Sequence, residues 1–205
     1  MIFYKGIDLN SYVNGVANTK TIRTLGLGLK HDISGRPWCS SSANACNIDI
    51  TTIHCSISGN TGSYAFTGDK NGSDNLEQIE AFEGIDDTTI PGNYPAFYFG
   101  KYYMDVIGSN VSRTDYESGW YLPSAAELYR IYACRHDASN GFDIKAAKEA
   151  LGGDTFGEGS YWSSSQVGGS RYYWAYLINL YTGSFSPENK SNPYHHCVCC
   201  IREFN

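Results

Sequence analysis

Residues 161–165 of the chain are Tyr-Trp-Ser-Ser-Ser, and residues 174–181 are Trp-Ala-Tyr-Leu-Ile-Asn-Leu-Tyr. The second stretch alternates as a β-strand does, with Tyr176, Ile178 and Leu180 on one face and positions 175, 177, 179 and 181 on the other. We expect the first face to be buried and the second to be exposed. Residues 184–197 follow without one aliphatic side chain. Their Tyr, Ser and Asn are typical of a recognition surface, because they give contact area and adaptable hydrogen bonds at low entropic cost.

The composition narrows the class of protein. The 205 residues include 15 basic and 21 acidic side chains, for a formal net charge of −6, and no basic run occurs, which argues against a nucleic-acid partner. The 17 Tyr and 22 Gly favour strands and loops over a helical bundle. We expect a single domain over residues 1–205, with an elaborated, strand-rich N-terminal half at residues 1–74.

The predicted elements are strands toward both ends of the chain and helices between them. Residues 25–30, 48–53 and 64–67 have the pattern of strands. From Pro95 to Gly108 a helix and a strand are both compatible with the sequence. Ser124 and Glu127 form a capping box at the start of the clearest helix, and a shorter helix is expected at residues 143–151. This order predicts an α+β fold.

Seven cysteines are present, at positions 39, 46, 55, 134, 197, 199 and 200. The odd number leaves at least one free thiol, and the neighbours Cys199 and Cys200 cannot point to the same side of a strand. A complete disulfide framework is therefore disfavoured. We expect buried free cysteines that act as small apolar side chains.

Three motifs occur in order, at residues 119–128 (Gly-Trp-Tyr-Leu-Pro-Ser-Ala-Ala-Glu-Leu), 161–165 and 198–202 (Val-Cys-Cys-Ile-Arg). The set resembles a bacterial family with the signature G-W-x-L-P-[ST]-x-x-E-L, Y-W-S-S, A-W-x-V-x-F-x-x-G and V-R-x-[VI]-R. That family includes the C-terminal domains of collagen-like adhesins. The resemblance covers residues 75–204 and implies a C-type lectin-like fold of antiparallel strands with two or three helices. The chain departs from the signature at Tyr176, Leu180 and Cys199, where the family has Trp, Phe and Arg.

Related lectin-fold proteins include the variable proteins of diversity-generating retroelements, whose C-terminal codons are rewritten at adenines. Tyr, His, Cys, Ser and Pro are all reached from an Asn codon by changing adenines alone, and residues 191–197 are Ser-Asn-Pro-Tyr-His-His-Cys. An ordinary aromatic binding loop has the same composition. Both interpretations, diversified and fixed, stay open.

The resemblance implies a non-enzymatic ligand-binding protein, an adhesin or receptor-recognition protein at the cell surface or secreted. Its partner would be a protein receptor or a glycan. The first residues predict neither a signal peptide nor a membrane span, so a cytoplasmic protein and one whose leader has been removed both fit. The expected ligand-binding residues are Arg171, Tyr172, Tyr173, Leu177, Asn179, Tyr181, Ser184, Ser186, Glu188, Asn189, Tyr194, His195 and His196.

An alternative function is a copper-dependent oxidase, because the formylglycine-generating enzyme shares the lectin-like fold and uses a C-terminal cysteine pair with copper. The cysteines of this chain are bunched more tightly than that pair. Cys197 and Cys200 form a single C-x-x-C, and adjacent ligands converge poorly on one tetrahedral ion. We therefore expect no metal, no cofactor and no catalytic residue.

Two further alternatives rest on short segments. Asp69, Asn71 and Ser73 alternate as oxygen donors near Glu77, but the register of a calcium loop is incomplete, and Asn71-Gly72 favours a hairpin turn. The serines at residues 163–165 have no spacing that suggests a catalytic His and carboxylate, so we expect them to make turn hydrogen bonds.

Overall fold

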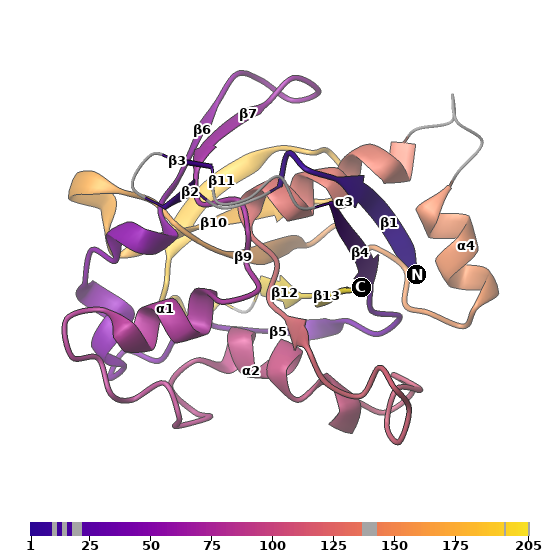
Figure 1. Ribbon diagram of the computed structural model, residues 1–205, viewed down its shortest axis with the longest axis horizontal. Helices are drawn as coiled ribbons and strands as arrows, with labels where there is room; N and C mark the ends of the chain where they lie inside the picture. The colour runs from indigo at the N-terminus through magenta and orange to yellow at the C-terminus, as the bar shows by residue number, and fades with distance from the viewer. Residues whose placement is uncertain (10–11, 14–15, 18–21, 137–142, 195, 205) are drawn as a thin grey trace.

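The computed structural model describes the chain except residues 10–11, 14–15, 18–21, 137–142, 195 and 205 (Figure 1). The fold is α+β, with antiparallel sheets and helices packed around them. This mixture of elements confirms the fold class predicted from the sequence. No helix in the described part of the chain is long and apolar enough to cross a membrane.

A five-stranded sheet lies at the centre. Its strand order is β11-β10-β9-β12-β5, and its pairs are antiparallel except for β9 and β12, where Cys197 lies beside Tyr161 in parallel register. The strands are β5 (Asp32–Arg36), β9 (Ser160–Gln166), β10 (Trp174–Asn179), β11 (Phe185–Asn189) and β12 (His196–Val198).

A four-stranded antiparallel sheet contains strands from both ends of the chain. Its strand order is β1-β4-β13-β8. Its strands are β1 (Ile2–Gly6), β4 (Arg23–Leu27), β8 (Trp120–Tyr121) and β13 (Ile201–Glu203). Two hairpins complete the strands: β2 (Tyr12–Val13) with β3 (Val16–Ala17), and β6 (Cys55–Ser58) with β7 (Ala65–Gly68).

The helices are α1 (Asn75–Ala81), α2 (Pro95–Lys101), α3 (Ala125–His136) and α4 (Ile144–Ala150). The capping box predicted for α3 is present: Glu127 N donates to Ser124 Oγ (3.2 Å), and Ser124 N donates to Glu127 Oε2 (2.8 Å). Asp143 caps α4 by accepting hydrogen bonds from two backbone amides. Short 3₁₀ turns lie at Asn44–Asn47, Thr51–Ile53, Tyr103–Asp105 and Gly169–Arg171.

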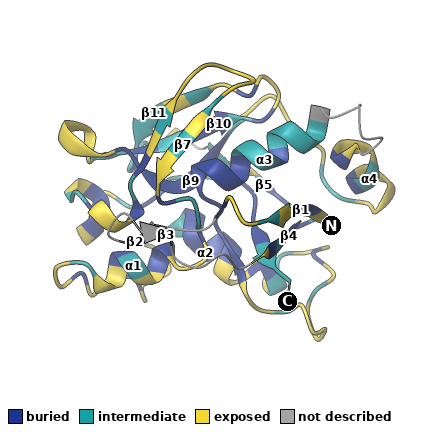
Figure 2. Ribbon diagram, turned by 45° about the horizontal axis from the view of Figure 1, so that its top comes forward, coloured by how far each residue is buried: buried dark blue, intermediate teal, exposed yellow. Residues whose placement is uncertain are grey.

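Apolar side chains pack on both faces of the central sheet. One cluster contains Trp38, Trp162 and Leu177 together with side chains from α1 and α2. The other contains Tyr161 and Ile178 with side chains from α3, β1 and β4. Figure 2 shows the buried residues of α3 and β9 facing each other. The central sheet therefore has little open face for a ligand.

Three expectations about local structure were wrong or only partly right. Residues 48–53 contain the 3₁₀ turn Thr51–Ile53 rather than a strand. The segment around Asn71-Gly72 leads into α1 and is not a hairpin turn. Asp69 explains the second difference, because its buried carboxylate accepts hydrogen bonds from Asn71 N and Asn75 Nδ2 and organises the loop. The segment from Pro95 to Gly108 is helical rather than a strand, but its α-helix ends at Lys101 and a 3₁₀ turn follows at Tyr103–Asp105.

Candidate ligand-binding surface

Strand β10 is a central strand, and the structure corrects the expectation that one of its faces is exposed. Leu177, expected in the ligand site, is only 2% exposed and packs with Trp162. Ile178 and Leu180 on the opposite face are fully buried, as expected, while Tyr176 is partly exposed. The reason is the N-terminal half of the chain, whose residues around Trp38 and Ile50 cover the face on which Leu177 lies.

The segment between β9 and β10, with the first residue of β10, carries four side chains that we call the aromatic platform: Arg171, Tyr172, Tyr173 and Trp174. The ring centroids of Tyr172 and Tyr173 are 5.6 Å apart, as are those of Tyr173 and Trp174, and both pairs are edge-to-face. The Arg171 guanidinium lies 5.2 Å from the Trp174 ring centroid. Tyr172 is 37% exposed, and Tyr173 and Trp174 are partly buried.

Strand β11 brings two more of the expected residues beside the platform. Asn189 lies opposite Trp174, and Glu188 lies opposite Ala175. The backbone ties the two segments together, because Lys190 N donates to Tyr173 O (3.0 Å). The register therefore places Asn189 on the same face of the sheet as Trp174, whereas Glu188 lies on the other face, with buried Ala175.

A second group of expected residues lies at the opposite end of β10. Asn179 Oδ1 accepts hydrogen bonds from the backbone N atoms of Tyr181 and Thr182, and this shapes the turn to β11. Tyr181 is 58% exposed, with the Arg135 guanidinium 5.4 Å from its ring centroid. Ser184 is exposed in the same turn. Five residue steps along a strand separate this turn from Trp174 by about 17 Å, so the two groups do not form one small-molecule site.

The remaining expected residues lie between or beyond these groups. Ser186 is exposed on the edge strand β11. Tyr194 is 77% exposed on the loop before β12, and His195 lies outside the described residues. The His196 ring packs edge-on against Trp162 with centroids 5.1 Å apart, and its Nε2 is buried without a hydrogen-bond partner. Burial lowers the pKa of His196, while the charge of Glu188 opposes that shift.

Lys190 fastens the end of β11 to the N-terminal half of the chain. Its side chain is fully buried, and Nζ donates to Ala45 O (2.8 Å), Ile48 O (3.2 Å) and Gln166 Oε1 (3.1 Å). Nζ also lies 5.0 Å from the Trp38 ring centroid. Burial lowers the pKa of Lys190 to about 8. This role could not be predicted from local sequence patterns, because all the partners of Nζ lie far away along the chain.

Trp174 was also missed as a member of the candidate site. The sequence analysis used it only as the first residue of the alternating strand, and the structure places it against Arg171 and Tyr173. The available signal was the uninterrupted run of three aromatic residues at positions 172–174.

The C-terminal cysteines are packed into the interior. Cys199 and Cys200 are fully buried, and burial raises the pKa of Cys199 to about 12 and that of Cys200 well above its ordinary value. Within the described part of the chain, His, Cys, Asp and Glu side chains nowhere gather in a group of three or more that could hold a metal ion. None of the seven cysteines forms a disulfide bond.

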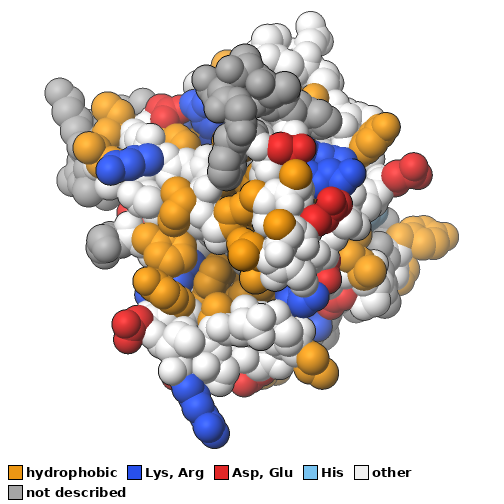
Figure 3. All heavy atoms as spheres, turned by 90° about the vertical axis from the view of Figure 1, so that its right-hand side faces the viewer, with side chains coloured by type: hydrophobic (Ala, Val, Ile, Leu, Met, Phe, Trp, Pro, Cys, Tyr) orange, Lys and Arg blue, Asp and Glu red, His pale blue; other side chains and the backbone are white. Residues whose placement is uncertain are grey.

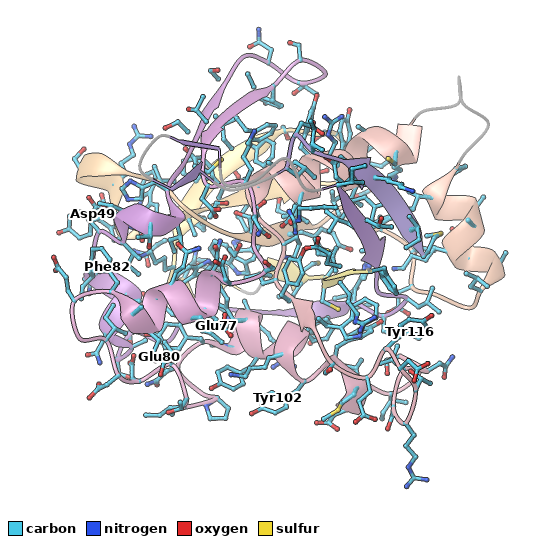
Figure 4. All side chains as sticks on the ribbon, viewed as in Figure 1. Asp49, Glu77, Glu80, Phe82, Tyr102 and Tyr116 are labelled. Atoms are coloured by element: carbon cyan, nitrogen blue, oxygen red, sulfur yellow. The ribbon has the colours of Figure 1, made fainter. Side chains whose placement is uncertain are left out.

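Two larger cavities lie away from the expected residues. One of about 390 Å³ is lined mainly by apolar residues, including Met1, Ile2 and Phe204, and Figure 3 shows hydrophobic side chains gathered around a hollow on that face. The other, of about 560 Å³, includes Glu77 of α1 and Tyr102 beyond α2, and Figure 4 labels Glu77 beside α1 and Tyr102 below α2. Neither is lined by a residue that the sequence placed in the ligand site.

No family model matches the chain, and no curated protein matches it. The family resemblance suggested by the three sequence motifs therefore remains a prediction.

Proposed function

We propose that this chain is a non-enzymatic binding protein that recognises a protein receptor or a glycan through the aromatic platform. The observation that carries the proposal is the edge-to-face cluster of Tyr172, Tyr173 and Trp174 at the surface, with Arg171 stacked on it. A cluster of this kind offers large contact area with few rotatable bonds, so little side-chain entropy is lost on binding.

The neighbouring polar groups give the platform the means to orient a ligand. The Arg171 guanidinium can donate hydrogen bonds to hydroxyl or carboxylate oxygens, and the Asn189 amide can both donate and accept. Tyr and Arg are the side chains most often found at the energetic centre of protein interfaces, and aromatic rings also stack on the apolar faces of sugars. The same surface chemistry thus serves both ligand classes.

A rigid support lies behind the platform. Lys190 ties the end of β11 to Ala45, Ile48 and Gln166 through one buried ammonium group. A binding surface held in this way loses less conformational freedom when it meets a ligand. This support favours recognition by a largely preformed surface.

We also propose that the scaffold is lectin-like and that the exposed C-terminal positions are diversified. Support comes from the burial of three residues of the motifs: Trp120 is 8% exposed, Leu122 1% and Trp162 0%. In contrast to these buried residues, Tyr181, Ser184, Ser186 and Tyr194 are exposed. No observation favours the copper-dependent oxidase, since Cys199 and Cys200 are fully buried thiols with raised pKa values.

The test compares binding by the two ends of β10. Wild-type protein, Tyr172→Ala and Tyr181→Ala are applied to a glycan array and to an array of extracellular receptor domains. Tyr172→Ala should weaken binding at least about tenfold, as loss of an aromatic anchor does. Tyr181→Ala is the matched control, because it removes an exposed tyrosine from the other end of the strand, and it should change binding less than about twofold.

Three results would count against the proposal. Binding that depends on Tyr181 and not on Tyr172 would move the site to the other end of β10. Absence of binding to both arrays would argue against recognition of either ligand class. Stoichiometric copper in the purified protein, held through the C-terminal cysteines, would favour the oxidase.

A further inference from the structure

A cavity of about 250 Å³ lies beside the β6–β7 hairpin, which projects from the body of the protein (Figure 1). Its lining comes from three segments that are distant in the sequence: the loop after β1, the chain around β7 and the first turns of α3. Three aromatic and three charged side chains line it: Tyr64, Phe66, Tyr129, Asp8, Lys70 and Arg130. The buried side chains of Leu9 and Ala126 line it as well. The cavity therefore combines apolar surface with charged groups.

The aromatic rings of the cavity are held by contacts with one another and with Phe185 of β11. The Tyr64 ring centroid lies 5.6 Å from that of Tyr129 and 5.2 Å from that of Phe185, both edge-to-face. The Phe66 centroid lies 5.4 Å from that of Tyr129 and 5.7 Å from that of Phe185. All four rings are partly exposed. Rings that support each other in this way lose little side-chain entropy when a ligand covers their remaining surface.

The charged side chains of the cavity are arranged around Arg130. Its Nη2 forms an ion pair with Asp8, and its guanidinium lies 5.8 Å from the Tyr4 ring centroid. Asp8 is held from the other side, because Tyr4 OH donates to its Oδ1 (2.5 Å). Lys70 is a second cation in the lining. Among the described residues that line the cavity, two cations thus stand against one carboxylate, in a chain whose formal net charge is −6.

We propose that this cavity binds a small aromatic carboxylate, a molecule with one flat ring and one carboxylate group. The ring packs against Tyr64, Phe66 and Tyr129, where edge-to-face and offset-stacked contacts add to the burial of apolar surface. The carboxylate accepts hydrogen bonds from Arg130 and Lys70. A guanidinium has five N–H donors, and the contact with Asp8 uses Nη2, so the group can bind Asp8 and a ligand carboxylate together.

The size and charge of the cavity limit the ligand class. Pockets for drug-sized ligands span about 300–1,000 Å³, so a cavity of about 250 Å³ suits a molecule with a single ring and a short chain. The excess of cations favours an anionic ligand over an amine. The cavity shares no lining residue with the aromatic platform, so the two surfaces can be tested separately.

The first experiment is a calorimetric titration of the wild-type protein with three probes. 3-Phenylpropionate carries the ring and the carboxylate, 3-phenylpropylamine replaces the carboxylate by a cation, and propionate lacks the ring. We expect 3-phenylpropionate to bind with a dissociation constant of about 1 mM or lower, and each of the other two to bind at least about tenfold more weakly. Absence of binding by 3-phenylpropionate, or equal binding by the amine or by propionate, would overturn the proposal.

The second experiment places the probe in the cavity. Arg130→Met removes the guanidinium and should weaken binding of 3-phenylpropionate at least about tenfold, as loss of a charge-assisted hydrogen bond does. The Arg130 side chain is 44% exposed, so the variant should fold. Lys145→Met is the matched control, because it also removes the cation of an exposed ion pair, with Glu149 on α4, and it should change binding less than about twofold.

A further pair of variants tests the aromatic wall. Tyr64→Leu replaces the ring by an aliphatic side chain and should weaken binding about fivefold or more, whereas Tyr64→Phe keeps the ring and should bind as the wild type does. Circular dichroism and thermal unfolding show whether each variant is folded, and if Tyr64→Leu is not, Arg130→Met decides. Wild-type affinity in Arg130→Met would refute the site. Binding that depends on Tyr172 instead of Arg130 would place the probe on the aromatic platform and would refute it equally.

Discussion

Lys148 and His31 form a buried hydrogen bond, in which Lys148 Nζ lies 2.5 Å from His31 Nε2. The lysine is 1% exposed and the histidine 7%. Because Nε2 accepts from the ammonium group, the imidazole is neutral and its Nδ1–H is free to donate to Tyr161 OH, 3.1 Å away. Lys148 Nζ also donates to Asp154 O (2.7 Å), and Asp154 pairs with Lys30. This contact fixes α4 on the body of the protein.

The stability of the protein should decrease as the pH falls below about 6.5, the ordinary pKa of histidine. Burial, with the charges of Lys148 and Lys30, lowers the pKa of His31 well below that value. In this pH range the unfolded chain therefore binds a proton at His31 that the native state does not bind. The free energy of unfolding decreases as the pH falls. The slope for this one group has an upper limit of about 1.4 kcal/mol per pH unit.

The measurement is the difference in unfolding free energy between wild type and His31→Gln, followed by urea denaturation from pH 7.5 to pH 5. The glutamine keeps an acceptor near Lys148 Nζ but does not titrate. Other groups cancel in the difference, including Asp69, whose pKa burial raises to about 7 and which contributes a change of opposite sign. A difference that stays constant with pH would show that His31 is not the titrating group.

Replacement of Lys190 by methionine should destabilise the protein by about 3 kcal/mol. The substitution preserves the apolar stem but leaves Ala45 O, Ile48 O and Gln166 Oε1 without their shared donor in a buried place. Lys145→Met is the matched control, because the Lys145 side chain is 47% exposed and should change stability by less than about 0.5 kcal/mol. Equal effects of the two substitutions would contradict the anchoring role of Lys190.

Substitution of Gly183 by alanine should cost more stability than the same change at Gly152. Both glycines have positive φ, +75° and +71°, so each alanine incurs backbone strain of about 1 kcal/mol. At Gly183 the new Cβ would also lie 2.3 Å from the Tyr132 ring of α3, whereas at Gly152 it would meet nothing within 4 Å. We expect a further loss of about 1–3 kcal/mol at Gly183. Thermal unfolding of both variants measures the two losses of stability, and the difference between them is the cost of the clash with Tyr132.

Local signals in the sequence predicted the elements whose stabilising contacts are themselves local. The start of α3 was predicted from Ser124 and Glu127, which form their reciprocal hydrogen bonds within one turn. Helix α4 was predicted at residues 143–151, and the structure places it at Ile144–Ala150 with Asp143 as its cap.

Elements held by distant partners could not be predicted in this way. Ile48 and Ile50 alternate like a strand, but the oxygen of Ile48 and the amide of Ile50 bond to side chains of Lys190 and Gln166. The same long-range packing explains why Leu177 is buried although it was expected to be exposed. Alternation shows that β10 has two faces, but not that the segment around Trp38 covers the second of them. The candidate site was therefore predicted as a segment, while its division into two ends needed the structure.

Leu177 and Ser186 lie opposite each other in the register of β10 and β11, yet their substitution should have very different effects. Leu177 is 2% exposed and packs in the core, so Leu177→Ala should cost about 3 kcal/mol. Ser186 is exposed, and Ser186→Ala should stay within about 0.5 kcal/mol. Urea denaturation of the two variants measures the contrast, and similar losses would mean that Ser186 also supports the fold.

This contrast sharpens the proposal that the C-terminal surface is diversified. A rewritten codon persists only where the protein tolerates many side chains, and a loss of about 3 kcal/mol is a large share of the stability of a typical domain. Sister sequences should therefore vary at Tyr172, Tyr181, Ser184, Ser186 and Tyr194, whereas Leu177 should stay as constant as Trp162. The measurement is sequencing of sister genes over this region. Variation at Leu177 as frequent as at Ser186, or substitutions that do not fall on adenines, would leave a binding protein of fixed specificity.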